Sequence, residues 1–232
     1  MLRPSCALRK KTRIAVDACM TLSQLFLMTY GLISERAHEW IGILMFTLFL
    51  LHHALNRKWL NAIPRGRYNR LRTVQTVLAA LILLCMLGSA ASGVILSRYV
   101  FAGLSFHGLI SAAGKVHMLC AYWGYALMSV HLGLHWGMIS AVLRRCVLLP
   151  GGVLRPVGLA AAIYGVYAFY KRSIWQYMFL ISHFVFFDYS EPVIFFFLDY
   201  IAVMWLFAYI GNVAMKLIKK RPENINSKIG GQ

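Results

Sequence analysis

The chain has 232 residues, of which 60% are hydrophobic and 13% are charged. Soluble domains carry about a quarter of their residues as charged ones, so this composition excludes an ordinary soluble domain and indicates an integral membrane protein. The formal net charge of +17 does not indicate nucleic-acid binding, because the basic residues lie in short clusters between long apolar runs.

Six apolar segments predict an all-α integral membrane fold of six transmembrane helices, the first four forming a bundle. At about 20 apolar residues per span, the length leaves no room for a separate soluble domain. Residues 171–191 are aromatic and mixed in polarity, which favours an interfacial or re-entrant stretch over a seventh span. The six predicted spans cover residues 13–33, 38–60, 73–97, 113–140, 153–170 and 192–218.

The Lys and Arg residues are distributed unevenly between the two sides of these spans. With a cytoplasmic N-terminus, 19 of the 24 fall on inner segments, as the positive-inside rule requires. We therefore expect a multi-pass protein of the bacterial inner (cytoplasmic) membrane with both termini in the cytoplasm. The predicted organisation is a four-span bundle at 1–145, two further spans with an outer interfacial segment at 146–221, and a polar cytoplasmic tail at 222–232.

Four histidines repeat one spacing in the second and fourth predicted spans. His38 and His52 are fourteen residues apart, and so are His117 and His131. At 100° and 1.5 Å per residue, that step returns to within about 40° of the same helix face and covers roughly 21 Å. Both spans run from outside to inside, so His38 and His117 share the outer level, and His52 and His131 share the inner level.

Two facing imidazoles at one depth are what a six-coordinate haem iron requires, and an apolar cavity favours electron transfer. One intramembrane histidine could equally be a hydrogen-bonded packing residue, but two matched pairs favour ligation, since ionisable groups in spans are costly and usually functional. The five cysteines form no CxxC or CxxCH motif, which argues against covalent haem attachment. We predict two haem b groups, with His38 and His117 as the outer metal ligands and His52 and His131 as the inner ones.

The inner pair leaves two alternatives open. His53 adjoins His52 but is displaced by about 60° from His38, so helical phase favours His52. His135 lies eighteen residues beyond His117, which is five full turns and nearly the same face. His135 is kept as a replacement cofactor ligand, or as a group near a haem propionate or a quinone.

Other residues inside the predicted spans also bear on function. Gly42, Gly124 and the GSAASG run at 88–93 would let a flat macrocycle approach, although small residues are also usual where helices pack in lipid. An unpaired Asp199 would be costly in the sixth span, so we expect it to pair with a neighbour, stay protonated or relay protons. Asp17 follows the basic N-terminal residues, and a local ion pair is its simplest interpretation.

The segments HEWIG at 38–42, LHHAL at 51–55, VHMLCAYWGY at 116–125 and HLGLHW at 131–136 carry a resemblance to known cytochromes. They resemble the membrane cytochrome b subunits of formate dehydrogenases and hydrogenases. More closely, they resemble a bacterial family of small haem-binding membrane proteins with a domain of unknown function, found alongside extracytosolic flavoproteins. The resemblance covers about residues 12–140.

The resemblance implies an electron-transfer subunit of an oxidoreductase system, working between a quinol pool or cytoplasmic donor and an outer redox partner, with a flavin-carrying protein as one candidate. Two other functions stay open. A metal or haem transporter would use the same histidines as transient ligands along a water-filled path. A non-redox membrane anchor would use them as packing residues and would bind no chromophore.

Overall fold

The computed structural model describes residues 4–65, 67–104, 108–146 and 151–220. These residues form helices and connecting segments without a strand, which confirms the all-α prediction. The predicted tail at 222–232 lies outside the described residues. The long helices are α1 (Pro4–Leu27), α2 (Glu35–Leu55), α4 (Arg70–Leu96), α5 (Ile110–Leu134), α7 (Gly151–Lys171) and α9 (Val193–Lys220), and the short ones are η1 (Tyr30–Leu32), α3 (Arg57–Ala62), α6 (Trp136–Cys146) and α8 (Ile174–Met178).

Three of the described helices, α2, α4 and α9, are long and apolar enough to cross a membrane. Large apolar side chains such as Leu84 on α4 and Ile194 on α9 are exposed on their outer faces. A continuous apolar exterior of this kind suits contact with lipid rather than water. The structure therefore supports the membrane character that the composition indicates.

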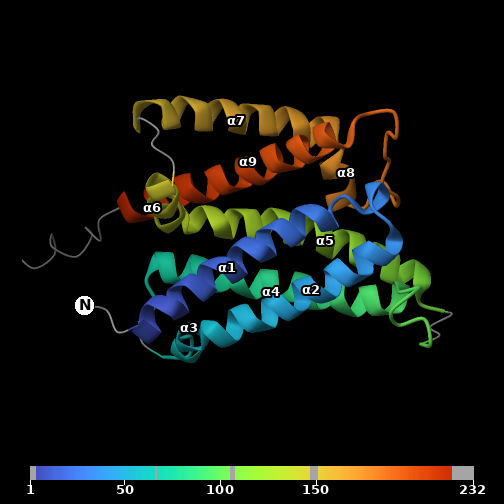
Figure 1. The fold of residues 1–232 in the computed structure, drawn as a ribbon, viewed down its shortest axis with the longest axis horizontal. Coiled ribbons are helices and arrows are strands. Elements are labelled where there is room, and N and C mark those ends of the chain that lie inside the picture. The colour runs from blue at the N-terminus through green and yellow to red at the C-terminus, as the bar shows by residue number, and fades with distance from the viewer. Residues whose placement is uncertain (1–3, 66, 105–107, 147–150, 221–232) are drawn as a thin grey trace, which may run out of the picture.

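Successive long helices run in opposite directions (Figure 1). One end of the bundle holds the start of α1, the short helices α3 and α6, and the last turn of α9; we call it the α3 end. The other holds η1 and α8; we call it the α8 end. Both histidine-bearing helices, α2 and α5, run from the α8 end to the α3 end, so they are parallel, as the predicted topology requires.

Helix α5 lies between α4 and α9, and α7 packs on the far side of α9 (Figure 1). Glycines let these backbones approach closely. A Cβ added to Gly133 of α5 would overlap the Ala208 carbonyl of α9, and one added to Gly211 of α9 would overlap the Val130 carbonyl of α5. Small residues at helix interfaces allow this packing where lipid supplies no hydrophobic drive between helices.

The apolar core has two parts. The first, near the α8 end, joins α5, α8 and α9 through residues such as Tyr125, Tyr177 and Tyr200. The second joins α2, α4 and the last turn of α5 and includes Phe49 and Leu134. Because α2 packs mainly on α1, with a smaller contact to α4, its histidine side chains are free to reach toward α5.

The helix ends differ from the predicted spans at two functional places. The predicted spans 38–60 and 113–140 each contain a break, because α2 ends at Leu55 and α5 ends at Leu134. At the first break, the Asn56 side chain donates to the His52 carbonyl over 2.9 Å, and the Asn56 backbone N–H also bonds to that carbonyl. Such capping bonds satisfy carbonyls that lack a partner in the last turn.

Candidate functional site

His38 and His117 face each other near the α8 end. His38 lies in the first turn of α2 and His117 near the start of α5. Their ring centroids are 6.2 Å apart and the ring planes are inclined by 68°. An imidazole nitrogen binds a first-row metal at about 2 Å, so two imidazoles on opposite sides of one iron hold their centroids about 6 Å apart. The observed separation fits that arrangement.

The Nδ1 atoms of this outer pair have different surroundings. His117 Nδ1 lies 3.1 Å from the Ser89 carbonyl oxygen and 3.1 Å from Ser92 Oγ, both on α4. Ser92 donates its own proton to the Gly88 carbonyl, so His117 Nδ1 is the donor and its Nε2 keeps a free electron pair. An acceptor of this kind orients metal-binding histidines. His38 Nδ1 is buried and has no hydrogen-bond partner among the described residues.

The glycines near the outer pair divide into two kinds. A Cβ on Gly42 would meet nothing within 4 Å, and one on Gly93 would lie 3.6 Å from His117 Cε1. By contrast, a Cβ on Gly88 would lie 2.5 Å from Cys120 Sγ, and one on Gly124 would contact Cys85 at 3.4 Å. Gly88 and Gly124 therefore serve the packing of α4 on α5, whereas Gly42 leaves open space near His38.

Glu39, which follows His38, binds the segment that follows α4. Its carboxylate accepts hydrogen bonds from Ser97 Oγ at 2.7 Å, from the Arg98 backbone N–H at 2.7 Å and from the Val100 backbone N–H at 2.8 Å. These contacts fix the position of the first turn of α2, and hence of His38, relative to α4. The sequence offered one signal for this role, an acid beside a predicted ligand.

The inner histidines gather near the α3 end together with an acid from α1. His52 Nδ1 lies 2.7 Å from Asp17 Oδ1. The rings of His131 and His135 are 4.8 Å apart, and His52 is close enough to interact electrostatically with both. His131 Nδ1 is buried, and no hydrogen-bond partner for it lies in the part of the chain that the structure describes. Asp17 thus pairs with a predicted ligand, rather than with the basic N-terminal residues that its sequence position suggested.

His53 lies differently from His52, although the two are neighbours. Its Nδ1 is 2.9 Å from the Phe49 carbonyl of its own helix, and its ring centroid is 4.3 Å from that of Phe49. His52 Nδ1 instead contacts Asp17, and its Nε2 lies 3.5 Å from Asn56 Nδ2. The choice of His52 over His53 as a ligand stays the prediction made from helical phase.

Helices α2 and α5 share the same order of histidines, cap residue and following short helix. The sequence shows no repeat of fixed period that would have revealed this relation. Each ends three residues after its second histidine, has one cap residue and is followed by a short helix, α3 or α6. In this comparison His135 is the counterpart of a cap residue, and His131 is the counterpart of His52. One offset of 79 residues relates His38 to His117, His52 to His131, and Asn56 to His135.

The histidines form pairs rather than a cage for a bare ion. Across the described parts of the chain, no group of three or more His, Cys, Asp or Glu side chains is arranged to hold a metal ion. A haem iron needs only two axial ligands from the protein, because the macrocycle supplies the other four. Two histidines at one level could therefore serve a haem iron, and the acceptor at His117 Nδ1 suits such ligation.

A separate polar cluster lies at the α8 end, where the structure places Asp199. Its fully buried carboxylate contacts Lys171 Nζ at 2.9 Å, Arg172 Nε at 2.7 Å and the Tyr164 hydroxyl at 2.5 Å. Glu191 contacts the same two cations at 3.0 and 2.6 Å. Of the three states considered for Asp199, the structure shows pairing with neighbours. The cluster ties α7 to α9.

Comparison with known protein families, with curated proteins and with solved structures finds no match.

Proposed function

We propose that the chain is a di-haem cytochrome of the b type that carries electrons across the bacterial cytoplasmic membrane. The observation that carries the proposal is the 6.2 Å separation of the His38 and His117 ring centroids, with His117 Nδ1 held by acceptors on α4. The inner group, His52 with His131, supports it through the same offset along α2 and α5.

The proposal includes six membrane spans, formed by α1, α2, α4, α5, α7 and α9, with both termini in the cytoplasm. Each of these helices has at least 21 residues, and about 20 residues are enough to cross the hydrocarbon layer. Their alternating directions support an even number of crossings (Figure 1). The basic residues 57–72 lie at the α3 end, which the positive-inside rule assigns to the cytoplasm.

Each histidine has a defined task in this proposal. His38 and His117 would hold one haem, and Ser89 accepts the hydrogen bond that keeps the His117 tautomer with Nε2 free. His52 and His131 would hold the second haem, and the Asp17 carboxylate orients His52 and would make it a stronger electron donor. Haem bound at these positions would supply a one-electron carrier at each of two membrane depths.

The proposed electron path needs a partner on each side of the membrane. A quinol pool or a cytoplasmic donor would deliver electrons, and an extracytosolic redox protein, such as a flavin-carrying one, would accept them.

The test is the absorption spectrum of the purified, full-length protein, reduced minus oxidised, with haem counted per chain. We expect low-spin b-type bands and two haems. The exposed His183 supplies a matched control, because His183→Ala should keep both haems while His117→Ala loses one. A folded, colourless protein would contradict the proposal and favour the membrane anchor, whereas binding of metal ions without haem would favour a transporter.

A further inference from the structure

We infer that α3 and the segment leading into α4, residues 57–72, form a binding surface for the phosphate groups of anionic phospholipids. We call it the 57–72 surface. It holds six basic residues and no acidic one: Arg57, Lys58, Arg65, Arg67, Arg70 and Arg72. This inference does not depend on haem binding.

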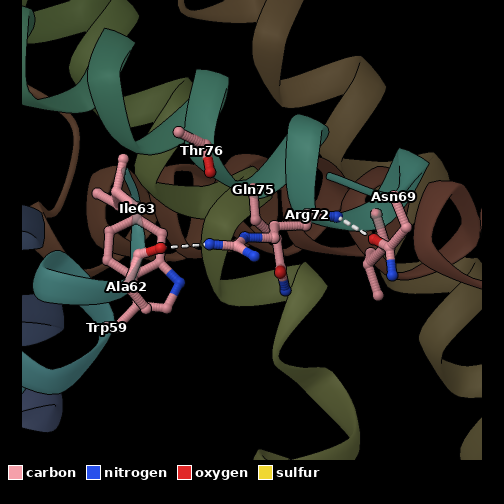
Figure 2. A pocket seen from close by; sticks show the side chains of 8 residues that line it. Trp59, Ala62, Ile63, Asn69, Arg72, Gln75 and Thr76 are labelled. Atoms are coloured by element: carbon pink, nitrogen blue, oxygen red, sulfur yellow. Dashed lines mark hydrogen bonds between the residues drawn. The ribbon is translucent and has the colours of Figure 1, made fainter. Parts of the chain in front are cut away.

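One of these cations organises the others. The Arg72 guanidinium donates hydrogen bonds to the backbone carbonyls of Ala62, Arg65 and Arg67 and lies over the Tyr68 ring at 4.6 Å. Figure 2 shows the Arg72 side chain reaching across to Ala62. The hydrogen bonds of Arg72 hold the segment between α3 and α4 in its conformation. Arg72 is therefore a positioning residue rather than a lipid contact.

The other five cations point outward and have no protein anion to neutralise them. Arg57, Lys58, Arg65, Arg67 and Arg70 are all exposed. None of them forms an ion pair with any side chain in the described part of the chain. Near an anionic membrane surface, each basic residue contributes roughly 1 kcal/mol of attraction. Five such residues in one short segment make this end of the molecule a strong site for lipid phosphate.

The position of the surface identifies lipid as the partner. It joins the end of α2 to the start of α4, and both are candidate membrane-spanning helices, so its cations lie at the depth of lipid headgroups. Trp59 and Tyr68 are 39% and 46% exposed there, and such aromatic residues are typical of the membrane–water interface. A soluble acidic partner would not need these aromatic side chains.

A shallow pocket beside the cations offers a place for the glycerol and upper acyl carbons. It has a volume of about 280 Å³ and is lined by Trp59, Ile63, Gln75 and Thr76 among others. Figure 2 shows Trp59 and Ile63 on one side of Arg72 and Asn69 on the other. Topology alone predicts cations at this end of the bundle, but not a pocket beside an arginine-organised loop.

The test measures binding of phosphatidylglycerol and phosphatidylcholine to the detergent-purified full chain by native mass spectrometry. The loop variant carries Arg65→Gln, Arg67→Gln and Arg70→Gln and keeps Arg72. The matched control removes three charges from the same end of the molecule, through Lys216→Gln, Lys219→Gln and Lys220→Gln on α9. Haem content is recorded separately, so failure of this inference is distinct from failure of the proposed function.

We expect the loop variant to bind phosphatidylglycerol at least about tenfold more weakly, because three of the five contacts are lost. The α9 variant should bind it within about twofold of the wild-type protein, and phosphatidylcholine binding should not change in either variant. An equal loss in both variants would assign the effect to net charge and overturn the inference. Unchanged phosphatidylglycerol binding in the loop variant would overturn it as well, as would displacement of the lipid by a soluble acidic polymer at physiological salt.

Discussion

Glu35 and Glu39 lie one turn apart in α2 but make contacts of different strength. Glu39 accepts bonds from the Ser97 hydroxyl and from three successive backbone N–H groups. Hydrogen bonds to charged groups contribute about 1.5–3 kcal/mol each, and part of this is lost if one partner changes. We expect Glu39→Gln to lower the free energy of unfolding by about 2–3 kcal/mol, measured by thermal or denaturant unfolding in detergent.

Glu35→Gln is the matched control for that measurement. Glu35 contacts Arg98 at 3.3 Å, and the Arg98 side chain is 74% exposed. Exposed ion pairs contribute about 0–1 kcal/mol, so this variant should unfold almost like the wild-type protein. Equal destabilisation by the two substitutions would show that Glu39 does not fix the loop after α4.

Glu191 predicts how stability at the α8 end changes with pH. A hydrogen bond from Lys171, with further help from Arg172, lowers the pKa of Glu191 below its ordinary value of 4.5. The unfolded chain therefore takes up this proton at a higher pH than the folded chain does. The stabilisation is complete above pH 4.5 and is lost as the pH falls through the folded-state pKa.

We expect Glu191→Gln to lower stability at neutral pH by about 1 kcal/mol or less, because the group is near the surface. The variant should also lose less stability than the wild-type protein on acidification, since it has no proton to bind. Melting temperatures measured from neutral pH to below pH 4.5 would check this. Parallel curves for the two proteins would contradict the role given to Glu191.

At the scale of elements, α5 and α9 depend on glycine at their crossing. A methyl group at Gly133 would overlap the Ala208 carbonyl. This carbonyl is part of the backbone of α9, so it cannot move aside as a flexible side chain can. We expect Gly133→Ala to cost about 1–3 kcal/mol, as overpacking in a close-packed interior does. Gly114→Ala in the same helix meets nothing within 4 Å and should be neutral or stabilising by about 0.5–1 kcal/mol. Unfolding measurements that show no difference between the two would contradict this packing.

The equivalence of α2 and α5 separates the two candidate inner ligands on α5. His135 corresponds to the cap residue Asn56, so His135→Asn gives α5 the same cap as α2. We expect this variant to keep both haems, whereas His131→Asn should lose the inner one. Haem content per chain measures both outcomes. Retention by His131→Asn with loss in His135→Asn would reverse the assignment.

Much of this architecture can be predicted from the sequence. The remaining features depend on contacts between residues far apart in the chain. Composition predicts the all-α fold, and a fourteen-residue spacing predicts which helix faces meet, as at His38 and His117. The break at Asn56 was missed although the polar residues Asn56, Arg57 and Lys58 mark it, because the predicted span was carried through them to the apolar Trp59 and Leu60. The Asp17–His52 contact was missed because it joins residues 35 positions apart, and charge patterning considers only neighbours along the chain.

At the scale of the whole molecule, the antiparallel bundle sets the two histidine groups near opposite ends (Figure 1). Because α2 and α5 are parallel, one spacing along each helix produces two matched levels. The fourteen-residue step corresponds to roughly 21 Å along the axis; with a haem at each level, as proposed, it would divide the bilayer into shorter steps for an electron. At the α8 end, the ion-pair cluster ties α7 to α9. At the α3 end, the 57–72 surface is the proposed contact with lipid phosphate.

The central claim is that His38 and His117 bind the same iron. The most direct measurement is low-temperature electron paramagnetic resonance of the oxidised, purified protein, which separates two low-spin haems by their g values. We predict two signals in the wild-type protein, loss of the same signal in His38→Ala and His117→Ala, and loss of the other in His52→Ala. Loss of different signals in the His38 and His117 variants, or of none, would contradict the account.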